Sequence, residues 1–160
     1  MPARAGRGVA FGDFDNDGFV DVVVANNGDP PTLLHNSGSN GNHFVNFKLV
    51  GTKSNRDASG ARIRVTAGGI SQLREIAGGG SYLSQSDLRA NFGLGKNSVA
   101  QSVEVSWPSG AHQVFQDVKG DRFYVIEEGR SELGLQRIRG RNFPEYEPAL
   151  PSGKAAPAKP

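Results

Sequence analysis

Residues 8–24 read GVAFGDFDNDGFVDVVV. Residues rich in Val and Phe begin and end this stretch, and residues 13–21 between them hold four aspartates, one asparagine and one glycine. Val and Phe are frequent in strands, whereas Asp, Asn and Gly are frequent in turns. The stretch therefore predicts a strand, an acidic loop and a second strand.

The acidic loop has the spacing of a calcium-binding loop. Its carboxylates stand at loop positions 1, 3, 5 and 9, and Gly18 stands at position 6, where such a loop turns sharply. Four carboxylates at short range repel one another unless a divalent cation lies among them. We therefore expect bound Ca²⁺ with these ligands: the side chains of Asp13, Asp15, Asp17 and Asp21 and, at position 7, the backbone carbonyl of Phe19.

The loop differs from an EF-hand in two respects. Position 12, where an EF-hand has a bidentate glutamate, is Val24, and both flanks are strand-like instead of helical. The alternative interpretation is a solvated turn that binds no metal, because Asp, Asn and Gly favour turns by themselves.

Further along the chain, up to residue 130, the pattern also indicates strands. The apolar segments are short, rich in Val, Ile and Phe, and separated by turn residues, including many of the 22 glycines. Arginines alternate with apolar residues in residues 61–65, which is the period of a half-buried strand. The predicted strands are Gly8–Gly12, Val20–Ala25, Thr32–His35, Phe44–Val50, Ala61–Ala67, Ile70–Ile76, Val103–Ser106, Gln113–Gln116 and Arg122–Ile126.

Composition restricts the class of protein. A chain of 160 residues can hold one ordinary domain and a smaller unit. The absence of cysteine excludes a disulfide framework, a thiolate metal site and a cysteine nucleophile. The net charge is +2, so we expect no nucleic-acid partner, and no apolar run approaches membrane-spanning length, so we expect no membrane insertion. No signal peptide is recognisable at the start of the sequence.

We expect three regions. Residues 1–38 form the calcium-loop hairpin, residues 43–129 form a larger β domain, and residues 130–160 form a Pro-, Ala- and Lys-rich tail that has too few apolar residues to fold. The tail holds 6 of the 18 basic residues, and we expect its arginines to be solvated. The predicted fold class is all-β: a calcium-loop hairpin packed against a β-sandwich-like domain, followed by a disordered C-terminal tail.

Residues 9–21, VAFGDFDNDGFVD, resemble an FG-GAP (VCBS-type) repeat, the calcium-loop unit of β-propellers. The resemblance implies that the four aspartates bind Ca²⁺ to hold a blade hairpin and activate no water. One copy is visible, whereas repeat architectures need several units to bury their faces. We therefore expect upstream propeller repeats outside this sequence.

Residues 43–129 resemble the ASPIC/UnbV domain, which follows FG-GAP repeats in the cartilage acidic protein family and in related bacterial secreted proteins. The resemblance implies a β-sandwich-like module with a binding role and no reaction. Asn91 departs from the family pattern, which has His before the Phe-Gly-Leu-Gly element. The segments that carry the resemblance are Gly51–Asp57, Gly60–Ile63, Gly79–Ser86, Phe92–Gly95 and Val105–Gly110.

Several of these segments have structural interpretations. We expect Trp107 to be a core or interface anchor before a turn, and residues 55–57 to form a self-bonded loop, with a contribution to a partner site as the alternative. Phe92 and Leu94 are expected to be buried, and the glycines that follow each of them are expected to let backbones approach closely. The three histidines, His35, His43 and His112, stand singly and are expected to be surface or hydrogen-bonded groups.

The leading hypothesis is a non-catalytic, calcium-stabilised binding or adhesion module with a protein or glycan partner. Because extracellular calcium is near millimolar, we expect an extracellular, cell-surface or periplasmic location. One alternative is an accessory part of a secreted carbohydrate-active or other hydrolytic enzyme, and another is an architectural cap that closes a propeller. The enzyme would need two carboxylates to converge from this set: Asp57, Glu75, Asp87, Glu104, Asp117 and Asp121.

Overall fold

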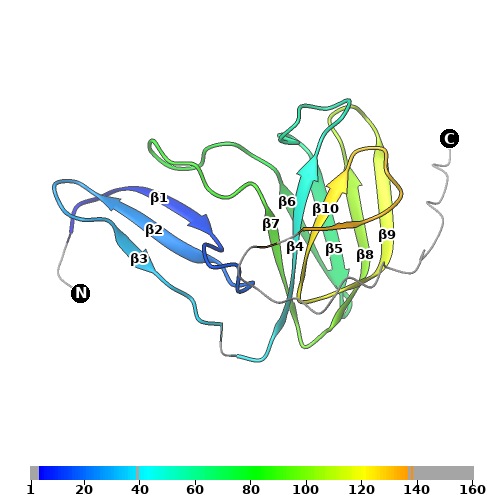
Figure 1. Cartoon of the computed structure of the whole chain (residues 1–160), viewed down its shortest axis with the longest axis horizontal. Coiled ribbons are helices and arrows are strands. Elements are labelled where there is room, and N and C mark those ends of the chain that lie inside the picture. Colours follow the sequence, from blue (N-terminus) through cyan, green and yellow to red (C-terminus); the bar gives the residue numbers. More distant parts are fainter. Residues whose placement is uncertain (1–3, 39, 137, 139–160) are drawn as a thin grey trace.

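The computed structural model describes residues 4–38, 40–136 and 138. The regular secondary structure of these residues consists of strands alone. These strands form three sheets, with the small hairpin sheet beside the larger pair (Figure 1). In the same residues, no helix has the length and hydropathy needed to cross a membrane. The predicted all-β fold class is confirmed.

The small sheet has the strand order β1-β2-β3, and both of its strand pairs are antiparallel. The acidic loop connects β1 to β2, as predicted, and the pair formed by Gly12 and Asp21 closes the ladder beside it. The bounds are β1 Gly6–Gly12, β2 Asp21–Asn26 and β3 Thr32–Leu34.

Two four-stranded sheets form the sandwich. The first sandwich sheet has the order β11-β10-β4-β7, and the second sandwich sheet has the order β6-β5-β8-β9. All pairs are antiparallel except β4 and β10, which run parallel. The bounds are β4 His43–Val50, β5 Arg62–Ala67, β6 Ile70–Glu75, β7 Ala90–Gly95, β8 Val99–Ser106, β9 His112–Lys119, β10 Arg122–Glu127 and β11 Gly134–Leu135.

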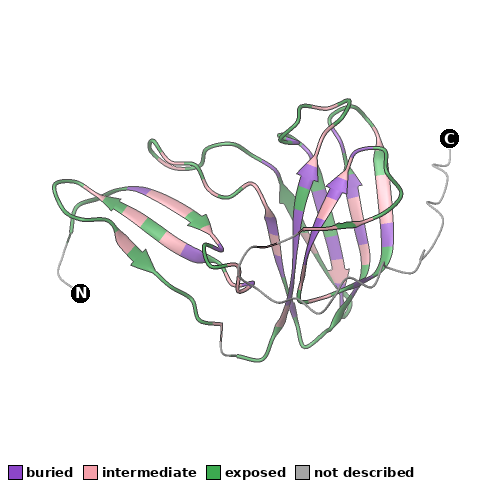
Figure 2. Ribbon diagram, in the orientation of Figure 1, coloured by how far each residue is buried: buried purple, intermediate pink, exposed green. Residues whose placement is uncertain are grey.

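The main core lies between the two sandwich sheets. On β5, Ile63 and Val65 are buried while Arg62 and Arg64 are exposed, which confirms the predicted alternation. Figure 2 shows the same alternation of buried and exposed residues along the sandwich strands. Aromatic rings fill the centre, where Phe47 stacks on Tyr124 and meets Phe92 edge to face.

A pair of matched substitutions tests this core. Ile63→Val deletes one methylene at a side chain with 0% exposure, and we expect a loss of about 1 kcal/mol in the free energy of unfolding. Ile70→Val makes the same deletion at a side chain with 68% exposure, and we expect little change. Urea unfolding of both variants measures the difference, and equal losses would contradict the assigned core.

The first sandwich sheet also buries residues on its outer face, away from the main core. Phe44 and Phe123 pack there with ring centroids 5.5 Å apart, and Asn46 lies fully buried on the same face of β4. Hydrophobic residues on the outer face of a sheet need a cover. The acidic loop provides part of that cover, because the ring of Phe19 lies 6.0 Å from that of Phe44.

The sequence did not predict strands β7 and β11. Phe92 and Leu94 are buried as expected, but they belong to strand β7. The expected close approach of backbones at the neighbouring glycines is wrong, because a side chain at Gly93 or Gly95 would meet no atom within 4 Å. Gly95 instead has a positive φ of 59°, which ends the strand.

The segment after residue 130 was predicted to be a disordered tail. Its described residues include β11, which pairs with β10 in the first sandwich sheet. Residue 137 and residues 139–160, which include Arg137, Arg139 and Arg141, lie outside the described residues.

Candidate metal loop and its contact with the sandwich

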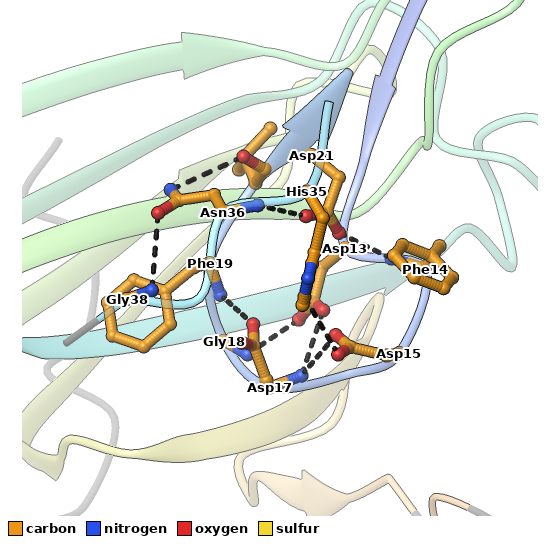
Figure 3. Close-up of polar contacts among 11 residues, drawn as sticks. Asp13, Phe14, Asp15, Asp17, Gly18, Phe19, Asp21, His35, Asn36 and Gly38 are labelled. Atoms are coloured by element: carbon orange, nitrogen blue, oxygen red, sulfur yellow. Dashed lines mark hydrogen bonds and ion pairs between the residues drawn. The ribbon is translucent and has the colours of Figure 1, made fainter. Parts of the chain in front are cut away.

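The structure brings the predicted carboxylates together in the acidic loop. One oxygen each from Asp13, Asp15 and Asp21 lies within 4.8 Å of the others, and Asp15, Asp17 and His35 form a second group with the same spacing. Asp15 belongs to both groups, so the two groups overlap at this residue. Figure 3 shows their side chains inside the turn of the loop.

The backbone of the loop is fixed by its own carboxylates. Asp13 accepts hydrogen bonds from the backbone N–H groups of Asp17 and Gly18, both at 2.9 Å. Asp21 accepts from the N–H of Phe14 at 3.1 Å and from that of Asn36 at 2.8 Å. Short loops use such bonds to satisfy backbone donors that no strand partner reaches. The loop is therefore closed at both ends.

The carboxylates at the two ends of the loop, those of Asp13 and Asp21, are buried and need compensating positive charge or hydrogen bonds. Asp13 and Asp21 are 1% and 2% exposed. Burial raises the pKa of Asp13, while the hydrogen bonds from Gly18 and Asp17 oppose that shift. A buried carboxylate favours a nearby cation, and a cluster of hard oxygen donors suits Ca²⁺. The donor set of this chain therefore fits the predicted ion.

Phe19 has two roles in the structure that the sequence did not reveal. Its N–H donates to Asp17 at 2.8 Å, and its ring fills the space beside Gly38 and Phe44. Its backbone carbonyl as the position-7 ligand stays a prediction.

His35 is a residue of the acidic cluster that sequence reasoning did not place there. Its Nε2 lies 3.2 Å from an oxygen of Asp15, and its ring meets that of Phe14 at 5.5 Å. The position of His35 follows from the strand pairing. Val22, near the loop end of β2, pairs with Leu34, so the next residue, His35, lies beside the loop.

Arg89 connects the loop to the sandwich. Its Nη1 donates to the side chain of Asn16 at 2.7 Å and its Nη2 to the backbone carbonyl of Asp13 at 2.9 Å. Its Nε lies 2.5 Å from Asp87, and its guanidinium lies 5.7 Å from the ring centroid of Phe123. One arginine of the sandwich therefore contacts two residues of the acidic loop.

The segment between β6 and β7 holds the outer edge of β1. Ser81 and Ser86 accept hydrogen bonds from the N–H groups of Val9 and Phe11, both at 3.2 Å. The N–H of Asp87 donates to the carbonyl of Phe11 at 2.8 Å. The sandwich thus contacts the small sheet along a strand edge and at the acidic loop.

A cleft of about 490 Å³ lies between the end of β1 and the segments that flank the β6–β7 connection. Glu75 and Asp87 both line it, so two of the carboxylates considered for acid–base chemistry do meet in one cleft. Arg62 lies 3.1 Å from Glu75, and Arg89 lies 2.5 Å from Asp87. Because an arginine engages each carboxylate, the geometry favours two ion pairs over an acid–base pair.

Comparison with known proteins assigns both parts of the chain. Residues 5–44 match the model of the FG-GAP repeat, and residues 51–133 match the model named ASPIC and UnbV. The chain belongs to the ASPIC and UnbV family. The second match covers more than half of the sequence and includes most of the sandwich.

Curated relatives support the ASPIC and UnbV assignment. Cartilage acidic protein 1 of Homo sapiens is 33% identical over 130 residues, which is 79% of this chain and 19% of the relative. Its counterparts in Xenopus tropicalis and Mus musculus are 34% and 32% identical over 113 residues, which is 68% of this chain and 17% of each relative. The chain thus spans about a fifth of the length of these relatives.

The first motif of the ASPIC and UnbV region surrounds a buried carboxylate that sequence reasoning missed. Glu128 Oε2 accepts from the backbone N–H groups of Thr52, Lys53 and Ser54 at 2.9, 2.8 and 2.7 Å. Glu128 Oε1 accepts from the hydroxyl of Ser54 at 3.0 Å and from that of Ser109. Glu128 thereby joins two loops that lie more than fifty residues apart in sequence.

These contacts set the ionisation of Glu128. Burial acts to raise its pKa, but hydrogen bonds from Ser109, Ser54, Thr52 and Lys53 outweigh that effect and lower the pKa from 4.5 to about 2. Hydrogen bonds to the charged form of a carboxylate lower its pKa in this way. The carboxylate is therefore a charged structural link in the ASPIC and UnbV region.

Other predicted features of this region are confirmed. Trp107 is buried, and the N–H of Gly110 bonds to the carbonyl of Trp107 in the predicted turn. Asn55 forms side-chain bonds with both backbone groups of Ser59, which makes the expected self-bonded loop. The two remaining histidines are hydrogen-bonded as expected: His43 to Asp121 and His112 to Ser106.

Proposed function

We propose that the chain is a non-catalytic, calcium-stabilised binding or adhesion module of a secreted or surface protein. The observation that carries the proposal is the clustering of Asp13, Asp15 and Asp21 in a closed loop between two strands, together with a second group of Asp15, Asp17 and His35 that overlaps it at Asp15. The FG-GAP and ASPIC and UnbV matches, together with the relatives named cartilage acidic protein 1, support a module of this class.

In this proposal Asp13, Asp15, Asp17 and Asp21 hold the ion, with the carbonyl of Phe19 as a backbone ligand. Ca²⁺ supplies positive charge to the cluster and no redox or Lewis-acid step. At about 1 mM Ca²⁺, an affinity of about 10⁻⁴ to 10⁻³ M would stabilise the fold by roughly 0.4 to 1.4 kcal/mol. Cytosolic calcium is far below that range, so the extracellular, surface or periplasmic location follows from the same proposal.

Calorimetric titration and thermal melts test the metal. We expect Ca²⁺ to release or absorb heat on binding to the wild-type chain and to raise its melting temperature, and we expect EDTA to reverse the rise. Asp15→Asn combined with Asp17→Asn keeps the shape of both side chains while removing two charges, so binding heat and the melting shift should disappear. Asp29→Asn, at an exposed position outside the cluster, is the matched control. Identical melts in Ca²⁺ and EDTA would contradict the proposal.

We further propose that the small sheet lies between other sheets in the assembled protein. Exposed apolar side chains lie on both of its faces: Val23 and Leu33 form a cross-strand pair on one face, while Phe11 and Leu34 lie on the other. A sheet of a single free-standing unit normally exposes one polar face. Upstream propeller repeats are the partners that this pattern supports, and a protein or glycan ligand would bind the larger assembly.

A further inference from the structure

Arg89 is placed to act on the acidic loop from outside it. The side chain is 14% exposed, and Arg89 directly precedes β7 of the sandwich. Its two terminal nitrogens donate to the carbonyl of Asp13 and to the side chain of Asn16, which are the first and fourth residues of the loop. Asp87 and the ring of Phe123 hold the guanidinium on the other sides.

The two contacted residues control the shape of the loop. Asn16 has a positive φ of 59°, a conformation that few residues other than glycine adopt readily. Asp13 provides the buried carboxylate that bonds the N–H groups of Asp17 and Gly18. By fixing Asn16 and the peptide of Asp13, Arg89 holds the part of the loop that directs Asp13 and Asp15 toward their shared centre.

The same surface carries an apolar contact. Gly18 lies against the ring of Phe44, and that ring also touches Phe19 and Phe123. The loop is therefore packed on the sandwich by aromatic rings and fixed there by one arginine. A change in the docking of the loop must change the positions of its carboxylates.

We infer that Arg89 is a positioning residue for the metal loop, so that calcium affinity depends on the docked sandwich and calcium in turn strengthens docking. The inference rests on the proposed calcium function. Coupling between two binding events is reciprocal, and typical values correspond to about 5- to 150-fold in affinity. The ASPIC and UnbV region therefore completes the metal site without supplying a ligand to it.

The geometry requires an arginine. Both terminal nitrogens of Arg89 and its Nε are engaged at once, in three directions set by the planar guanidinium. A lysine would keep the positive charge near the carboxylates but has a single nitrogen. Arg89→Lys and Arg89→Met therefore separate the effect of charge from that of shape.

Calorimetric titration of the full chain with Ca²⁺ is the first test. We expect Arg89→Met to weaken calcium binding by about tenfold or more and Arg89→Lys to weaken it by a smaller factor. Arg62→Met, which removes an exposed arginine from an ion pair on the sandwich, should leave calcium affinity unchanged. Equal affinity in the wild type and Arg89→Met would overturn the inference.

Hydrogen exchange measured by mass spectrometry tests the reverse direction. In the wild type, we expect Ca²⁺ to slow exchange in residues 13–19 and also in residues 86–91, which carry Arg89. In Arg89→Met, Ca²⁺ should still slow exchange in the loop but no longer in residues 86–91. Protection of both segments in both proteins would contradict the coupling.

The results distinguish this inference from the proposed function. A wild-type chain that binds no Ca²⁺ contradicts the proposed function, and the inference falls with it. A wild-type chain that binds Ca²⁺ with the same affinity as the Arg89 variants contradicts the inference alone. If circular dichroism shows that Arg89→Met is unfolded, Arg89→Lys decides the question. A calcium affinity of Arg89→Lys equal to that of the wild type also overturns the inference.

Discussion

Replacing Gly18 by Ala is expected to release the small sheet from the sandwich. Gly18 has a φ of 96°, and a Cβ at this position would lie 2.0 Å from a carbon of the Phe44 ring. The ring cannot move freely because it packs on Phe123 and Phe19. Backbone strain and the clash together are expected to cost about 3 kcal/mol.

Native-state hydrogen exchange measures this loss directly. Amides of β1 and β2 should lose protection in Gly18→Ala, whereas amides of β5 and β8, in the centre of the second sandwich sheet, should keep theirs. Gly28→Ala is the matched control because Gly28 also has a positive φ, 77°, but a Cβ there meets nothing within 4 Å. We expect a cost of about 1 kcal/mol for the control, from strain alone. Equal losses in the two variants would show that the contact with Phe44 is unimportant.

Acid is expected to destabilise the sandwich through Glu128. The pKa of this carboxyl is about 2 in the folded chain, below its ordinary value of 4.5, so the ionised form is the one that folding favours. The resulting stabilisation is fully present above pH 4.5 and is lost as the pH falls toward 2. Glu128→Gln should flatten this part of the stability profile and lower the stability at neutral pH.

Glu128→Ala should have a more severe effect because it leaves three backbone N–H groups and two hydroxyls without their shared acceptor. Denaturant unfolding of both variants between pH 2 and pH 7, followed by the fluorescence of the buried Trp107, measures the effect. Glu127→Gln is the control at the adjacent position, where the side chain pairs with Arg130 on the surface. An unchanged acid profile in Glu128→Gln would contradict the assigned role.

Features encoded by neighbouring residues were predictable from the sequence. The spacing of Asp13, Asp15 and Asp17 around Gly18 indicated a tight loop, and the flanking Val-rich runs indicated its two strands. Alternation identified β5 in the same way. In each case the periodicity of a single strand or the geometry of a single loop fixes which side chains lie together, so no long-range information is needed.

Contacts between distant residues were not predictable in this way. Arg89 meets Asn16 across 73 residues, and Glu128 meets Thr52 across 76 residues. Nothing in the immediate sequence of either charged residue distinguishes it from a solvated one. Strand β7 was missed for a related reason, since the glycines of Phe92–Gly95 weaken the strand pattern that pairing with β4 then overrides.

The contacts of Ser81 and Ser86 with β1 determine at which edge the small sheet can accept a further strand. On the outer side of this strand, the N–H groups of Val9 and Phe11 and the carbonyl of Phe11 are already bonded to the sandwich. An additional chain cannot pair with those groups unless it displaces the sandwich segment. Strand addition, whether during assembly or during fibril-like aggregation, is therefore directed to the opposite edge of the sheet, which β3 forms among the described strands.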